Sequence, residues 1–286
     1  MALYLQVCPE KSFSKSIEII DRILNSSPPK GVALQYKTLK GVQYFLLKDN
    51  DTAQKIIDTA IADFEAAGLD GVSFYELGML AQSLQILGEI TGNKSCFAES
   101  QIHLTKMLET HGLKPEGTAM IYSNLGHSLL SEGNPGEAKD YFIKSLEIDD
   151  NEITKVFLGK SWLHLQEFDN AEKILSQINI KNMDEREVYD YAVSWAILAL
   201  ETKRKDLLVM ASTLLNDAIP EGPLFRDIKD DLLSEVQRVI NGDKGGKILK
   251  LINRYLNLQP NLFGLGVNIN NILEDAGRKG GSNKDR

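Results

Sequence analysis

The chain has 286 residues, of which 43% are hydrophobic, and its formal net charge is −8. This acidic balance argues against nonspecific binding to nucleic acid, which depends on basic side chains that neutralise phosphates. It also gives no reason to expect attraction to an anionic membrane surface. A single compact core of this length would be unusually large, whereas a stack of repeats has no such size limit.

Cysteine usage and the N-terminal residues indicate the compartment. Cys8 and Cys96 are the two cysteines, far apart and without a CxxC partner, which argues against a disulfide framework or a zinc cluster and fits a reducing cytoplasm. Residues 1–8 lack the basic region and the apolar length of a secretory signal. No apolar stretch is long enough for a transmembrane helix. We therefore expect a soluble cytoplasmic protein.

Apolar residues recur at helical spacing along almost the whole chain, and alternating strand-like runs are nearly absent. Two hairpins are predicted within residues 119–178, with their turns at 134–136 and 168–170. Outside that region the pattern predicts further helices, in chain order, over residues 13–24, 33–47, 52–65, 73–90, 95–110, 184–201, 205–218, 224–240 and 247–258. The whole array would hold about six or seven helical pairs.

A repeated phrase lies in the middle of the chain. A Leu-Gly pair at Gly126 is followed 12 residues later by Ala138, and the same spacing separates Gly159 from Ala171. The two copies are 33 residues apart, a period typical of solenoids built from stacked helical hairpins. Small residues are needed where the two helices of a hairpin come closest, since a larger side chain there would cost about 1–3 kcal/mol.

With these residues the chain resembles the tetratricopeptide repeat family. The matching residues are Tyr122, Leu125, Gly126, Leu129, Ala138, Phe142 and Ser145 in one repeat, Leu158, Gly159, Trp162, Ala171, Leu175 and Ile178 in the next, and Gly41, Tyr44, Ala53, Ile57 and Ala60 in a weaker copy. The resemblance implies an all-α, right-handed solenoid of antiparallel helix pairs. In this family the first helix of each pair lines a concave groove that binds proteins or peptides, and nothing catalytic is implied.

We expect three parts along the chain. A repeat array is predicted over residues 1–259, clearest at 119–178 and weaker at 33–65. A C-terminal capping or docking segment would follow over 260–276. The polar, glycine-rich residues 277–286 are predicted to be a disordered tail.

Beside the Leu-Gly face, a mixed polar and aromatic strip is predicted to point into the groove. The candidate partner-binding residues are Ser123, Asn124, His127 and Ser131 from one helix and Phe157, Lys160 and His164 from the next. Such a strip suits an extended peptide or an acidic group, and the alternative is an ordinary solvated groove lining. Some relatives clamp a terminal carboxylate with lysines and asparagines. Asn124 matches one clamp position, but Thr38 and Val42 replace the first-repeat members, so we expect no such clamp.

Residues 260–273 differ from the rest because they are apolar, punctuated by glycine and poor in charge. A short helix over 268–276 would place its apolar residues on one face, and the docking candidates are Phe263, Ile269, Ile272 and Leu273. Two interpretations remain open. The segment is either a cap on the last repeat or a docking element for a partner or a second copy of the chain.

No catalytic, cofactor or metal site is predicted. The four histidines show no HxxxH or HExxH spacing, and residues 241–247 lack the pattern of a phosphate-binding loop. The favoured hypothesis is a non-enzymatic scaffold or adaptor that binds another protein or peptide. The alternative is a regulatory sensor that closes around a small peptide or metabolite and acts on a separate effector chain. Homo-oligomerisation is left open.

Overall fold

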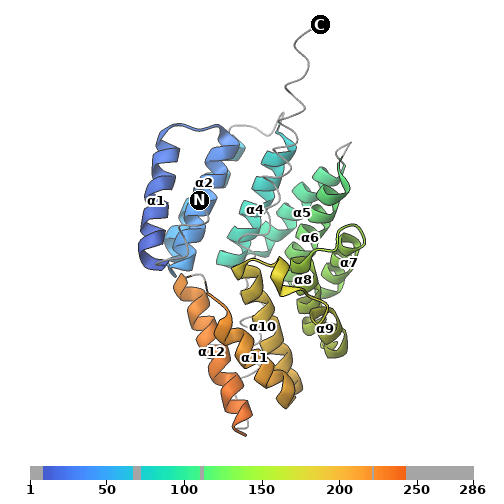
Figure 1. Ribbon diagram of the computed structural model, residues 1–286. Coiled ribbons are helices and arrows are strands. Elements are labelled where there is room, and N and C mark those ends of the chain that lie inside the picture. The colour runs from blue at the N-terminus through green and yellow to red at the C-terminus, as the bar shows by residue number, and fades with distance from the viewer. Residues whose placement is uncertain (1–8, 67–71, 110–112, 221, 243–286) are drawn as a thin grey trace.

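A computed structural model of the protein describes residues 9–66, 72–109, 113–220 and 222–242 (Figure 1). Within these ranges the chain forms twelve α-helices and no strand. Neighbouring helices pack as antiparallel hairpins, so the predicted all-α solenoid is confirmed. Among the described helices, none has a stretch long and apolar enough to cross a membrane.

Five hairpins, flanked by one helix at each end, make up the described fold (Figure 1). In chain order the helices are α1 (Pro9–Asn25), α2 (Lys30–Leu46), α3 (Asn50–Ala66), α4 (Phe74–Thr91), α5 (Lys94–Leu108), α6 (Pro115–Glu132), α7 (Pro135–Leu146), α8 (Glu152–His164), α9 (Phe168–Leu175), α10 (Glu185–Thr202), α11 (Lys205–Asp217) and α12 (Gly222–Ile240). A short 3-10 helix, η2 (Ile180–Asn182), precedes α10.

Local signals explain where several helices begin and end. Ser73 starts α4 with a capping box, since its side chain accepts from the Glu76 amide while the Glu76 carboxylate accepts from the Ser73 amide. Asn151 caps α8 in a related way. The turns predicted at 134–136 and 168–170 are wrong in detail, because Pro135 and Phe168 are already the first residues of α7 and α9. A proline is well placed at a first helical position, where its missing amide hydrogen is not needed.

The repeated glycines lie where the two helices of a hairpin approach most closely. A Cβ atom on Gly126 would lie 2.8 Å from the Phe142 ring and 3.0 Å from the Ala138 carbonyl oxygen. A Cβ on Gly159 would lie 2.8 Å from the Leu175 side chain. The physical reason that the sequence suggests for the repeat is therefore confirmed.

The first helices of the hairpins form an inner layer. Helix α2 contacts α4, and α8 contacts both α6 and α10. Between α4 and α6, the Gln85 side-chain amide donates to the backbone carbonyl oxygen of Asn124 at 3.2 Å. Helix α12 contacts α10 on one side and α2 on the other, which joins the last described helix to the N-terminal end (Figure 1). We call this set of helices, α2, α4, α6, α8, α10 and α12, the inner ring.

Candidate partner-binding face

Helix α6, a member of the inner ring, carries two buried polar side chains. Asn124 and His127 are three residues apart, so they lie on one helical face, and each is only 4% exposed. The Asn124 Nδ2 and His127 Nδ1 atoms have no hydrogen-bond partner. A buried polar atom without a partner costs about 1–3 kcal/mol. These two buried atoms therefore have unused hydrogen-bonding capacity.

Helix α8 places an aromatic ring beside His127 and a cation over that ring. The Phe157 ring lies 5.1 Å from the His127 ring, centroid to centroid, in an edge-on arrangement. The Lys160 Nζ atom lies 5.0 Å from the centroid of the Phe157 ring and 3.2 Å from the Asp190 Oδ1 atom of α10. We call Asn124, His127, Phe157, Lys160 and Asp190 the inner cluster.

The structure thus brings two of the predicted candidates, His127 and Lys160, against the ring of a third, Phe157. With Asn124, they are buried, so these four residues do not form a solvated lining, and their role in binding a partner stays a prediction. The other three candidates are half-buried. The Ser123 hydroxyl lies 3.1 Å from the Thr154 hydroxyl, the Ser131 hydroxyl donates to Glu89 Oε1 at 3.4 Å, and His164 ends α8.

Burial decides the charge of the inner cluster. Desolvation, with a smaller effect from the Lys160 cation, lowers the pKa of His127 to about 3, so its imidazole is neutral near pH 7. Desolvation also lowers the pKa of Lys160, while Asp190 and Glu89 act in the opposite direction. The Lys160 cation is paired with the Asp190 carboxylate, so the inner cluster carries no net positive charge. It consists of hydrogen-bonding groups around an aromatic ring.

Comparison with known families agrees with this architecture. A tetratricopeptide repeat profile matches residues 119–152, which include most of α6, all of α7 and the turn into α8. The chain is a helical-repeat protein with a tetratricopeptide repeat at residues 119–152. This repeat supports a general role in protein interaction. A comparison with curated proteins found no match.

The repeat period of the tetratricopeptide-like array also explains the one cluster member that the sequence prediction missed. Asn124, Phe157 and Asp190 follow one another at intervals of 33 residues, so they occupy one position in three successive first helices. Asp190 was missed because the hairpin of α10 and α11 has lost the Leu-Gly phrase. Extending the period beyond Ile178 would have predicted it.

The C-terminal docking candidates Phe263, Ile269, Ile272 and Leu273 lie outside the described residues. The boundary predicted at residue 259 and the segments 260–276 and 277–286 lie there as well. A cap or docking role for this part of the chain stays a prediction.

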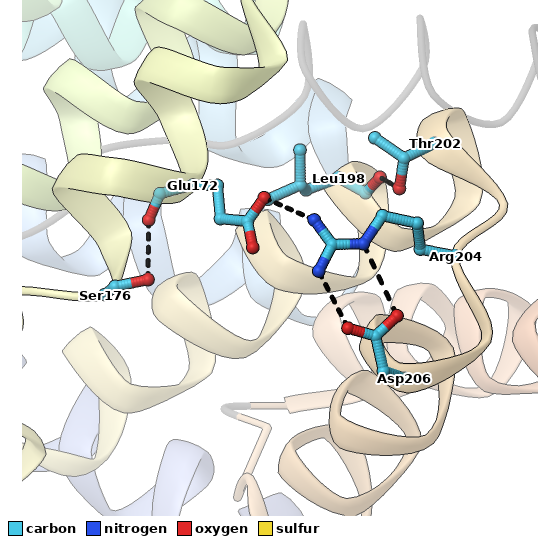
Figure 2. Close-up of polar contacts among 6 residues, drawn as sticks. All are labelled: Glu172, Ser176, Leu198, Thr202, Arg204 and Asp206. Atoms are coloured by element: carbon cyan, nitrogen blue, oxygen red, sulfur yellow. Dashed lines mark hydrogen bonds and ion pairs between the residues drawn. The ribbon is translucent and has the colours of Figure 1, made fainter.

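A second polar group, in the outer layer, is structural. Figure 2 shows Arg204 between two carboxylates. Its Nη1 atom donates to Glu172 Oε2 of α9 at 2.7 Å, and its Nη2 atom donates to Asp206 Oδ2 of α11 at 2.7 Å. These three side chains therefore link α9 to the start of α11. In the part of the chain that the structure describes, no group of three or more His, Cys, Asp or Glu residues is placed to hold a metal ion.

Proposed function

We propose that this chain is a scaffold or adaptor that binds a segment of another protein along the inner ring at the inner cluster. The observation that carries the proposal is the pair of buried, unpartnered atoms on one face of α6, Asn124 Nδ2 and His127 Nδ1. An extended peptide presents a carbonyl oxygen and an amide hydrogen at every residue. It can therefore satisfy both atoms at once.

The surroundings of these atoms indicate what kind of segment fits. Because His127 is neutral and Lys160 is paired with Asp190, attraction of an acidic ligand over long range is not favoured. The Phe157 ring is 3% exposed, so it would provide apolar surface for a side chain of the segment once the helices around it move apart. Recognition would rest on shape, backbone hydrogen bonds and an apolar contact, with little dependence on salt.

A photo-crosslinking experiment tests this proposal in the intact protein. A photoreactive amino acid replaces Ser131, which is half-buried beside the inner cluster, and in a matched variant it replaces Ile102, which is 57% exposed on the outer helix α5. After irradiation in cells, mass spectrometry identifies the crosslinked protein and its segment. We expect one specific segment to crosslink from position 131 and not from 102. Identical crosslinks from both positions, or none from 131, would contradict the proposal.

A further inference from the structure

The first turn of α12 closes the inner ring against the N-terminal helices. Gly222 has a φ of +78°, and a Cβ atom there would lie 3.2 Å from the Phe13 ring and 3.3 Å from the Leu46 carbonyl oxygen. One turn further, Asp227 forms an ion pair with Lys48, which follows α2. The start of α12 therefore touches both α1 and the end of α2 (Figure 1).

The apolar content of this joint is small. The two largest buried clusters of the described chain belong to its two ends, one in α1–α5 and one in α8–α12. Among the half-buried hydrophobic residues that the structure describes, Leu224 and Phe225 pack against both of these clusters. The ion pair of Lys48 and Asp227 is exposed, so water and salt weaken it.

On its other side, α12 is held more firmly. The Tyr189 hydroxyl of α10 donates to the Phe225 carbonyl oxygen at 2.9 Å, and the two rings lie 5.4 Å apart, centroid to centroid. Further along α12, Ile228, Leu232 and Val236 are buried in the cluster of α8–α12. If the inner ring opens at α12, it therefore opens between α12 and the pair α1–α2, and not between α12 and α10.

The inner cluster is covered in the closed ring. Asn124, His127 and Lys160 are each 4% exposed. Carboxylates from both sides, Glu89 of α4 and Asp190 of α10, act on Lys160, so the helices that flank α6 and α8 converge on this lysine. A protein segment can reach these side chains only if α4 and α10 move apart. The joint at α12 opposes that movement, because it links the two ends of the array that carry them.

We propose that the contact of α12 with α1–α2 is a latch. Its opening widens the inner ring and exposes the inner cluster to the segment that binds there. What enters the ring rests on the proposed function, whereas the opening itself can be measured without any ligand. The latch makes the affinity for a partner depend on residues that do not touch that partner.

The test uses a thiol inside the ring. In the full-length chain with Cys8→Ser and Cys96→Ser, the substitution His127→Cys reports on the inner cluster. A matched reporter, Ser100→Cys, sits at a fully buried hydroxyl without a hydrogen-bond partner in α5. The rate of reaction with iodoacetamide is measured for both reporters in native buffer. Lys48→Glu places two carboxylates at the joint and so weakens it. The double variant Lys48→Glu with Asp227→Lys restores an ion pair of reversed orientation. Gly222→Ala disturbs the joint by a different route, because it adds a methyl group against Phe13.

We expect Lys48→Glu and Gly222→Ala each to accelerate labelling of the His127→Cys reporter about fivefold or more, with no change at the Ser100→Cys reporter. The charge exchange should return the rate to that of the parent chain. Unchanged rates at the His127→Cys reporter in both variants, or equal acceleration at the two reporters, would overturn the latch. If labelling follows the expected pattern but no segment crosslinks from position 131, the latch stands and the proposed function fails.

Discussion

Lys160 and Asp190 form a partly buried ion pair that joins α8 to α10, with 3.2 Å between the Lys160 Nζ atom and the Asp190 Oδ1 atom. The lysine side chain is 5% exposed and the aspartate side chain is 24% exposed. The pair therefore holds two consecutive first helices together and removes free positive charge from the inner ring. The two residues contribute unequally, because only the lysine lacks access to water.

This asymmetry predicts different effects of the two single substitutions. Asp190→Ala leaves the Lys160 ammonium buried without its carboxylate and should lower the free energy of unfolding by about 3 kcal/mol or more. Lys160→Met leaves a partly exposed carboxylate that water can reach, so the loss should be about 1 kcal/mol or less. Urea unfolding followed by circular dichroism measures both. Equal losses would contradict the assigned burial of the pair.

The neutral imidazole of His127 predicts a pH dependence. Its pKa is about 3 in the folded protein and about 6.5 in an unfolded chain. Protons therefore bind the unfolded state first as the pH falls, and the contribution of His127 is present above pH 6.5 and is lost below it. By pH 5 the loss should be about 2 kcal/mol.

The control variant for this pH dependence is His127→Gln. Its side chain cannot titrate, and Lys160, Glu89 and the other histidines are unchanged. The difference in unfolding free energy between parent and variant is measured from pH 7.5 to pH 5. We expect it to shift by about 2 kcal/mol in favour of the variant. Parallel pH curves for the two proteins would show that His127 is not buried as a neutral group.

Two glycines in the same hairpin should respond oppositely to alanine. At Gly126 a methyl group would lie 2.8 Å from the Phe142 ring and 3.0 Å from the Ala138 carbonyl oxygen. Gly126→Ala should therefore cost about 1–3 kcal/mol. At Gly136, within α7, nothing lies within 4 Å of such a methyl group, so Gly136→Ala should raise stability by about 0.5–1 kcal/mol. Thermal unfolding of both variants checks the prediction, and a loss at Gly136 similar to that at Gly126 would contradict it.

The C-terminal segment can be assigned by truncation after Gln259. A cap on the last repeat predicts a lower unfolding temperature for the shortened chain, because apolar surface of the array becomes exposed. A docking element predicts an unchanged unfolding temperature together with loss of one binding partner. Differential scanning calorimetry and affinity capture with mass spectrometry, run on both chain lengths, distinguish the two. An unchanged temperature and an unchanged set of partners would exclude both roles.

Much of the fold was predictable because its signal is local. Gly126 with Ala138 and Gly159 with Ala171 mark helix crossings, and the 33-residue period places the first helices side by side. That period also places His127 and Lys160 at equivalent positions in consecutive repeats, and both side chains lie against the Phe157 ring.

Other features lack a local signal. Asp190 lies in a hairpin without the Leu-Gly phrase, where buried alanine and leucine along α10 replace the motif. The contact of Lys48 with Asp227 joins residues that are 179 positions apart. This contact depends on the total rotation of the array, to which every hairpin between the two residues adds a small step. No local sequence pattern around either residue predicts that total. The burial of the inner cluster depends on the same closure, so the sequence predicted groove-facing residues and did not predict that they are buried.

The central claim is that the inner cluster binds a protein segment through Asn124. Isothermal titration calorimetry with the crosslinked segment, prepared as a synthetic peptide, tests it most directly. The matched control is Asn216→Ala, at an exposed asparagine of the outer helix α11. We expect Asn124→Ala to weaken binding about 3- to 10-fold, the effect of losing one hydrogen bond, and Asn216→Ala to leave it unchanged. Equal affinities for the parent chain and Asn124→Ala would contradict the claim.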